Sequence, residues 1–379
     1  MLSRLYTDSS EHSALGRICR RLGRRIGGPI GRLSNREIEG IPPEKIFSTD
    51  AIFWSDLFRG RRRDPQIILC HRRHETLSRV MQRWGTADAD TLYTMYHEGL
   101  DFIRYAKDKG LRIVVDVFIH PMTDRIVNRE CLNHPGWQTP TTKSVLEFAD
   151  SLIRQALELA DVALCPSQWV AQGVSALSPA DARKIRICPY GSSIAYGGRV
   201  NDPVPGRVFY AAGCPVRKGL PDLARAADVL KAKYPLMDFR VAGITDPAIC
   251  RRPECRNLTF LGNLSGAQMQ EEFLSADMFV LPTHAEGLAS AVIEAIAAGC
   301  PVITTRQAGV SIRDGVDGVL LAPGDSEALV GAVERIYCDR NLRAKLAANT
   351  RTLAAEYTME AWRGRLVHLL GEMWPGGER

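Results

Sequence analysis

One segment, residues 278–305, constrains the fold of this chain more than any other. An apolar run, Met278 to Leu281, gives way to the polar turn His284-Ala-Glu-Gly287. The stretch Ala289 to Ala298 then reads as a helix with apolar residues on every side, and Pro301 to Thr305 is a second run suited to a buried strand. Strand, loop, helix and strand with a short crossover make up the repeating unit of an open parallel sheet.

The apolar helix carries one charged residue, Glu294, with no Lys or Arg within one helical turn of it. A helix that is apolar all round is buried, and an ionised carboxylate there is costly unless it is paired. Glu286 precedes the N-terminus of the same helix, where free N–H groups favour an anion such as a diphosphate. We expect a ligand that carries an anionic group and hydroxyls. The alternative is that Glu286 is a solvated loop residue and Glu294 pairs with a distant arginine.

The two glutamates have E-x7-E spacing and are followed by a helix exit of the AxxxGxPVI type, Ala295 to Ile303. This pattern resembles the donor site of the retaining, GT-B-fold glycosyltransferases of family 4, the glycosyl group 1 family. The resemblance covers roughly Lys107 to Trp362. Further matches follow in the family's order: Ala160 to Trp169, Ile187 to Gly191, Tyr210 to Gly219, Asn257 to Leu264, Gly315 to Leu321 and Glu327 to Arg340.

The resemblance implies an α/β protein with the GT-B fold, in which two Rossmann-like doubly wound domains face each other across a cleft. Alternating strands and helices in both halves of the chain also favour doubly wound sheets. We expect an N-terminal acceptor-side domain over 1–193, a nucleotide-sugar-binding domain over 194–358, and a helix over 359–379 that returns to the first domain. The N-terminal domain lacks the family's opening strand, Gly-rich loop and helix, through either a deletion or a misassigned start.

Four residues are expected to take part in catalysis, because the resemblance implies roles for them. Arg217 and Lys218 would clamp the diphosphate, with Lys218 the firmer assignment, since many family members carry the arginine at the position of Gly213. Glu286 would face the transferred sugar, and His120 would lie beside the sugar and the acceptor. The alternatives are an ordinary basic loop for the two cations and a structural role for His120.

The donor itself would be bound by Glu294 and by backbone groups. The resemblance implies that Glu294 accepts hydrogen bonds from the ribose hydroxyls, that the N–H groups of Gly287 and Leu288 lie near the sugar or phosphate, and that Gly213 belongs to the donor loop. No metal or other cofactor is expected, because Asp-x-Asp occurs only at Asp88-Ala-Asp90, in a polar stretch with no preceding strand.

The predicted activity is transfer of a hexose, with retention, from a UDP- or GDP-sugar to a glycan or lipid-linked acceptor in polysaccharide or surface-glycan synthesis. A nucleotide-sugar-binding partner or regulatory protein that has lost turnover is the alternative. A sugar-nucleotide epimerase of the same fold would need acid/base carboxylates that the first half of the chain does not offer.

Charge is concentrated at the start of the chain. Residues 1–63 hold 13 Lys and Arg against 7 Asp and Glu, an excess equal to the +6 of the whole chain. Arginines from Arg17 to Arg25 alternate with apolar residues, which predicts a basic amphipathic helix that rests on an anionic membrane or packs on its own domain. Nucleic acid is not expected. With 45% hydrophobic and 24% charged residues and no apolar stretch of membrane-spanning length, we expect a cytoplasmic, at most peripheral, protein.

Overall fold

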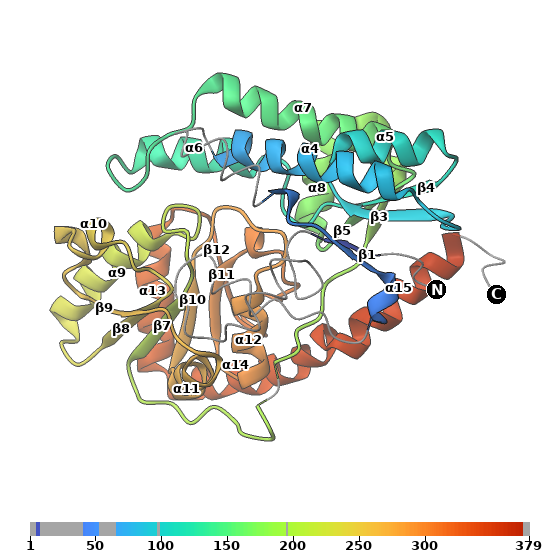
Figure 1. Cartoon of the computed structure of the whole chain (residues 1–379). Coiled ribbons are helices and arrows are strands. Elements are labelled where there is room, and N and C mark those ends of the chain that lie inside the picture. The colour runs from blue at the N-terminus through green and yellow to red at the C-terminus, as the bar shows by residue number, and fades with distance from the viewer. Residues whose placement is uncertain (1–4, 8–40, 53–65, 97–98, 195, 374–379) are drawn as a thin grey trace, which may run out of the picture. The chain divides into compact units, whose positions relative to one another are not determined.

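The structure, a computed structural model, describes residues 5–7, 41–52, 66–96, 99–194 and 196–373. The chain divides into two compact units, residues 1–116 with 141–163 and residues 117–140 with 164–379 (Figure 1). The domain boundaries expected at 193 and 358 stay predictions. The basic helix expected around Arg17 to Arg25 lies outside the described residues.

The first unit combines short parallel strands with long helices. The β-branched core of β4 is fully buried because helices α5 and α7 pack against this strand. Strand β3 pairs with β4 in parallel, from Thr91 opposite Arg112 to Met95 opposite Asp116, and β1 pairs with β2. Its elements are β1 (Leu5–Thr7), η1 (Pro43–Lys45), β2 (Ile46–Ser48), α4 (Gln66–Trp84), β3 (Thr91–Met95), α5 (Leu100–Asp108), β4 (Arg112–Asp116) and α7 (Lys143–Leu159).

A four-stranded sheet has the order β3-β4-β5-β6. Strand β5 (Val162–Cys165) is buried at every position and leads to α8 (Gln168–Leu177), after which η2 (Pro179–Lys184) precedes β6 (Ile185–Ile187). Ser167 caps α8, accepting a hydrogen bond from the N–H of Val170. Helix α6 (Thr123–Asn133) belongs to the second unit.

The second unit contains a parallel six-stranded sheet with the order β12-β11-β10-β7-β8-β9. The apolar run 278–281 forms a strand with the expected bounds. The elements are β7 (Arg207–Ala211), α9 (Leu220–Lys233), β8 (Asp238–Ala242), α10 (Pro247–Cys250), η3 (Pro253–Cys255), β9 (Leu258–Gly262), α11 (Gly266–Ser275), β10 (Met278–Leu281), α12 (Ser290–Ala298), β11 (Val302–Thr305), η4 (Arg306–Ala308), β12 (Val319–Leu321), α13 (Ser326–Cys338), α14 (Arg340–Ala354), η5 (Ala355–Tyr357) and α15 (Met359–Met373).

The strand order reverses between β7 and β10, which are neighbours in the sheet. The chain steps from β7 to β8 in one direction and from β10 to β11 in the other. Right-handed crossovers therefore place α9 and α12 on opposite faces of the sheet. Accordingly, α9 packs against α13, whereas α12 packs against α11 and α14 (Figure 1). This arrangement is the predicted doubly wound sheet.

The core of the second unit is built from the central strands. All of β10 is fully buried, and Phe279 on this strand packs against Phe209 of β7 and Phe273 of α11, with ring centroids 6.0 and 5.3 Å apart. Burial of each such aromatic side chain stabilises the fold by about 2–3 kcal/mol. The loops at the carboxyl ends of β7 and β10 are thus carried by the most rigid part of the sheet.

Helix α15 contacts the segment that follows β6. The guanidinium of Arg365 donates to the carbonyl of Pro189 at 2.8 Å, and Trp362 lies edge-on to Tyr190. The contact fixes the end of the chain against residues of the same compact unit. Across the part of the chain that the structure describes, no helix is long and apolar enough to span a membrane.

Candidate functional site

The switch point of the six-stranded sheet brings together the loops that the sequence singles out. The loop 212–219 follows β7, and the loop 282–289 follows β10. Doubly wound sheets bind ligands outside the carboxyl ends of the strands, at the point where the strand order reverses. The backbone joins the two loops directly, because the N–H of His284 donates to the carbonyl of Arg217 at 2.8 Å.

Glu286 lies between the two predicted cations. Its Oε1 atom is 2.7 Å from Nη1 of Arg217 and 2.5 Å from Nζ of Lys218. The Glu286 side chain is 8% exposed, so its interpretation as a solvated loop residue is wrong. Burial lowers the pKa of Lys218, and the charge of Glu286 opposes this effect without cancelling it. The cluster is a buried, charge-assisted clamp whose two cations stay next to each other because a carboxylate separates them.

The contacts of Glu286 leave one of its oxygens available. Thr283 also reaches Oε1, at 3.2 Å, and no hydrogen bond to Oε2 is found among the described residues. The sequence interpretation treated Glu286 as a free acceptor. In the structure only Oε2 of Glu286 is available to accept a hydrogen bond from a ligand, and the two cations lie beside it.

The N-terminus of α12 is a second feature of the site. Its N-cap residue is Ala289, which has no side-chain cap, and the N–H groups of Gly287 and Leu288 have no hydrogen-bond partner among the described residues. A Cβ on Gly287 would lie 1.7 Å from the carbonyl oxygen of Phe118, so only glycine fits there. Free N–H groups at a helix start favour an anion.

Glu294 lies in the second turn of α12 and is half-buried. No hydrogen bond or ion pair from the described residues reaches its carboxylate, and burial raises its pKa. The alternative, in which Glu294 pairs with a distant arginine, is therefore not found in the part of the chain that the structure describes. Tyr196 donates instead to the backbone carbonyl of Glu294, at 3.0 Å. The side chain remains open to a ligand.

His120 lies next to Glu286 but is held by other groups. Its backbone N–H donates to the carbonyl of Glu286 at 3.3 Å, and its ring stacks on Trp169 with centroids 4.1 Å apart. The Nδ1 atom accepts from the N–H of Met122. Burial lowers the pKa of His120 to about 4, so the imidazole is neutral near pH 7. The structure thus brings His120 to the site, and it also supplies structural contacts of the kind that the alternative interpretation requires.

Ser167 and Gly309 also meet the loop after β10. The hydroxyl of Ser167 donates to the carbonyl of Gly287 at 2.7 Å. Gly309 has a φ of 77°, and a Cβ on it would lie 2.1 Å from the same carbonyl. The carbonyl of Gly287 is therefore enclosed, which leaves the N–H side of the peptide to face a ligand.

A buried group behind the clamp escaped the sequence interpretation. His284 lies with Nε2 at 3.4 Å from Asp222 and Nδ1 at 3.9 Å from Glu130. Asp222 lies in the first turn of α9 and accepts a hydrogen bond from Ser326 at 2.8 Å. His284 is visible in the polar turn of the sequence, but its partners are distant along the chain.

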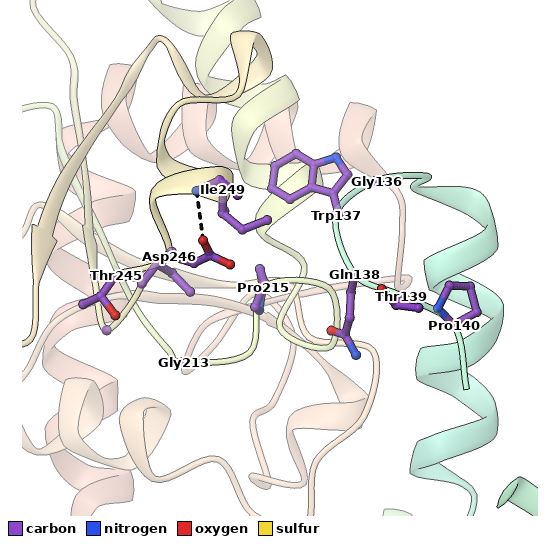
Figure 2. Close-up of a pocket in the computed structure, with 13 residues that line it drawn as sticks. Gly136, Trp137, Gln138, Thr139, Pro140, Gly213, Pro215, Thr245, Asp246 and Ile249 are labelled. Atoms are coloured by element: carbon purple, nitrogen blue, oxygen red, sulfur yellow. Dashed lines mark hydrogen bonds between the residues drawn. The ribbon is translucent and has the colours of Figure 1, made fainter. Parts of the chain in front are cut away.

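Gly213 belongs to the same loop after β7 and lines a cavity (Figure 2), but no contact of it with Glu286 is found among the described residues. The structure thus brings together Glu286, Arg217, Lys218, His120 and Gly287. Among the described residues no group of three or more His, Cys, Asp or Glu could hold a metal ion, and the expected absence of a metal cofactor stays a prediction.

Solved structures share this architecture over nearly the whole chain. Anabaena HepE, determined with UDP-glucose, matches with a TM-score of 0.59 and 14% identity, over 97% of this chain and 98% of that chain. Sucrose-phosphate synthase from Thermosynechococcus elongatus matches with a TM-score of 0.64 and 18% identity, over 89% and 85%. The fold is that of the GT-B glycosyltransferases, as predicted.

Residues 205–339 match the family described as Glycosyl transferases group 1, so the predicted resemblance to this family is confirmed. Sulfoquinovosyl transferase SQD2 of Arabidopsis thaliana is 26% identical over 255 residues, 58% of this chain and 49% of that protein. The Rhizobium meliloti lipopolysaccharide core glycosyltransferase LpsE is 36% identical over 102 residues, 26% of this chain and 30% of that protein. The chain thus spans about half or less of the length of these curated relatives.

Proposed function

We propose that this protein is a glycosyltransferase that takes a hexose from a UDP- or GDP-sugar and transfers it, with retention and without a metal, to a glycan or lipid-linked acceptor. The observation that carries the proposal is the pair of buried cations, Arg217 and Lys218, beside the uncapped N-terminus of α12. Structures of similar fold bind UDP and UDP-glucose, which supports a nucleotide-sugar donor.

The clamp fits the charge that develops as the donor breaks. When the bond between the anomeric carbon and the phosphate oxygen breaks, negative charge grows on the diphosphate, where Lys218, Arg217 and the N–H groups of α12 can stabilise it. Preorganised groups of this kind supply the largest part of catalysis in many enzymes. The acceptor oxygen bonds to the same face of the sugar, and its proton passes to the departing phosphate.

The two glutamates have separate tasks in this proposal. Glu294, for which no partner is found among the described residues, accepts hydrogen bonds from the ribose hydroxyls, and these offset the cost of its burial. The free oxygen of Glu286 accepts from the transferred sugar while its other oxygen holds the cations. In this proposal neutral His120 lies beside that sugar as a positioning side chain, because its Nδ1 accepts from the N–H of Met122 and its Nε2 packs against Gly173, where a Cβ would lie 2.4 Å away.

The test is turnover with a panel of donors. UDP-glucose, UDP-galactose, UDP-N-acetylglucosamine and GDP-mannose are each incubated with the full chain, with EDTA present, and release of nucleoside diphosphate is measured with and without mixed oligosaccharide acceptors. We expect release from at least one donor, an increase with acceptor, and an α-linked product by NMR. Binding without any release, across all donors, would favour the alternative of a nucleotide-sugar-binding partner. No binding at all would refute both.

A further inference from the structure

His284 is a buried histidine behind the clamp, and it has no part in the proposed transfer. Its side chain is 3% exposed and belongs to the loop after β10, two residues before Glu286. The ring lies with Nε2 at 3.4 Å from Oδ2 of Asp222 and with Nδ1 at 3.9 Å from Oε2 of Glu130. All of these residues belong to the second compact unit. Titratable side chains that are buried beside charged partners cluster at functional sites.

The two carboxylates that face His284 have no other cation. Oδ1 of Asp222 accepts from the hydroxyl of Ser326 at 2.8 Å, whereas Oδ2 makes no hydrogen bond within the described residues. Oε2 of Glu130 accepts from the side-chain amide of Asn133 at 3.1 Å. No Lys or Arg in the described part of the chain forms an ion pair with either carboxylate. Ionised carboxylates as buried as these are costly unless a positive charge lies close to them.

The two nitrogens of the His284 ring indicate which protonation state fits this geometry. A neutral imidazole has one N–H and one nitrogen with a lone pair, whereas an imidazolium has an N–H on both nitrogens. Each nitrogen of His284 faces a carboxylate oxygen. A neutral ring would therefore point a lone pair at one of the two carboxylates. Only the imidazolium directs a donor at each carboxylate and supplies the positive charge that they lack.

His284 also connects the two loops of the clamp. Its backbone N–H donates to the carbonyl of Arg217 at 2.8 Å, and the hydroxyl of Thr283 donates to the same carbonyl at 3.0 Å. The His284 ring reaches Asp222 in the first turn of α9, the helix that begins two residues after Lys218. The loop after β10 is thus joined to the loop after β7 and its helix through both the backbone and the side chain of one residue.

The charge of Asp222 is felt close to the clamp. Tyr210 on β7 is fully buried, and its hydroxyl has no hydrogen-bond partner among the residues described. Burial, and then the charges of neighbouring groups that include Glu286 and Asp222, raise the pKa of this hydroxyl. Both carboxylates are therefore within electrostatic reach of one phenol. A diphosphate at the clamp is repelled by Asp222 unless a positive charge such as an imidazolium balances it.

We propose that His284 is a positioning residue for the donor: held as an imidazolium between Asp222 and Glu130, it balances their charge and fixes the two loops of the clamp around the diphosphate. The proposal rests on the proposed function, because it concerns the diphosphate of the donor. In this role His284 acts through Asp222 and through the backbone of Arg217, and not by contact with the reacting atoms. The charge of residue 284, rather than its size, should then set the affinity for a nucleoside diphosphate.

The protonation state is tested on the full chain without ligand. Histidine labelled with nitrogen-15 is incorporated, and the ring nitrogens are observed by NMR at pH 7. We expect both ring nitrogens of His284 to carry a proton. His284→Gln removes these signals, and Asp222→Asn shifts them while the histidine stays in place, so the assignment does not depend on the folding of one variant. A neutral His284 ring at pH 7 would overturn the proposal.

A pair of variants separates charge from structure. His284→Gln keeps a side chain that donates hydrogen bonds but removes the charge. We expect it to weaken UDP or GDP, whichever binds the wild-type chain, about fivefold by calorimetry, and to change KM for the donor more than kcat. Adding Asp222→Asn removes the unbalanced charge and should restore the affinity to within about twofold of wild type. His368→Gln, at an exposed position of α15, is the matched control and should change nothing.

The outcomes distinguish this inference from the proposed function. Unchanged nucleotide binding in His284→Gln contradicts the role of its charge. A double variant that binds more weakly than either single variant also contradicts it, because a merely structural role predicts that result. In both cases the proposed function stands. A wild-type chain that binds neither UDP nor GDP contradicts the proposed function instead, whatever the protonation state of His284.

Discussion

Glu286 and Glu294 are eight residues apart in one loop and helix, yet the fold treats them in opposite ways. Glu286 is buried and receives two cations and a hydroxyl on one oxygen. Glu294 is half-buried, and no partner is found for it among the described residues. The comparison shows that the chain's own cations neutralise Glu286, whereas the carboxylate of Glu294 is left for a ligand to pair with. Binding and catalysis can therefore be separated by substitution at these two places.

The largest effect is expected from the clamp. Lys218→Ala removes one cation from the leaving diphosphate, and Arg217 remains to neutralise Glu286, so the fold should persist. We expect kcat/KM for the donor to fall at least tenfold, about 1.4 kcal/mol of transition-state stabilisation. Steady-state release of nucleoside diphosphate measures it. Lys233→Ala, at an exposed lysine in α9, is the control, and equal kinetics in the two variants would remove the clamp from the mechanism.

Glu294→Gln should weaken the binding of UDP and at the same time raise the free energy of unfolding of the ligand-free protein. Loss of a charged acceptor for hydroxyls costs about 1.5 kcal/mol, roughly tenfold in the affinity for UDP measured by calorimetry. Burial raises the pKa of Glu294, so the folded state binds this proton more tightly than the unfolded state, and stability falls as pH rises above the ordinary value. The variant lacks this cost.

The stability part has its own check. In urea unfolding without ligand, Glu294→Gln should exceed the wild-type chain by more at pH 7 than at pH 4. Glu327→Gln, at an exposed position of α13, should show no such pH dependence. A variant that is less stable than wild type at pH 7 would mean that Glu294 has a partner in the folded chain.

The last prediction concerns stability in acid, to which His120 contributes with a pH dependence opposite to that of Glu294. The pKa of His120 is lowered to about 4 by burial, so between about pH 6.5 and pH 4 the unfolded state binds more protons and stability falls as the pH falls. At about 1.4 kcal/mol per pKa unit, the loss approaches roughly 3 kcal/mol by pH 4. His120→Gln should lose less stability between pH 7 and pH 5 in the same urea experiment. An equal loss in both proteins would show that other groups govern acid stability.

The sequence predicted the central unit of the fold because its signals are local. The apolar run 278–281 and the glycine after the apolar helix each act within a few residues, and the structure has them where expected. The sequence also predicted that Glu286 belongs to the site. It did not predict that Glu286 is buried in an ion pair, because the cations that neutralise it lie 68 and 69 residues earlier in the chain and only the strand order brings them together.

Two other features could not be predicted, because they also depend on contacts between elements that are distant along the chain. Asp222, His284 and Glu130 meet through three elements that no local pattern connects. The segment 117–140 comes from the first half of the chain, yet it packs in one compact unit with the second half. Periodicity and spacing describe a residue's own element, whereas the pairing of buried charges depends on contacts between elements.

The positions of two tryptophans have a practical consequence. Trp137 forms part of the cavity wall under Arg252, and Trp169 stacks on His120 beside Glu286. Indole emission responds to its immediate surroundings, so the chain contains an intrinsic fluorophore on each side of the clamp loop. With the remaining tryptophans replaced by phenylalanine, quenching at one position or the other would report in real time which of these two places a ligand reaches, without any label.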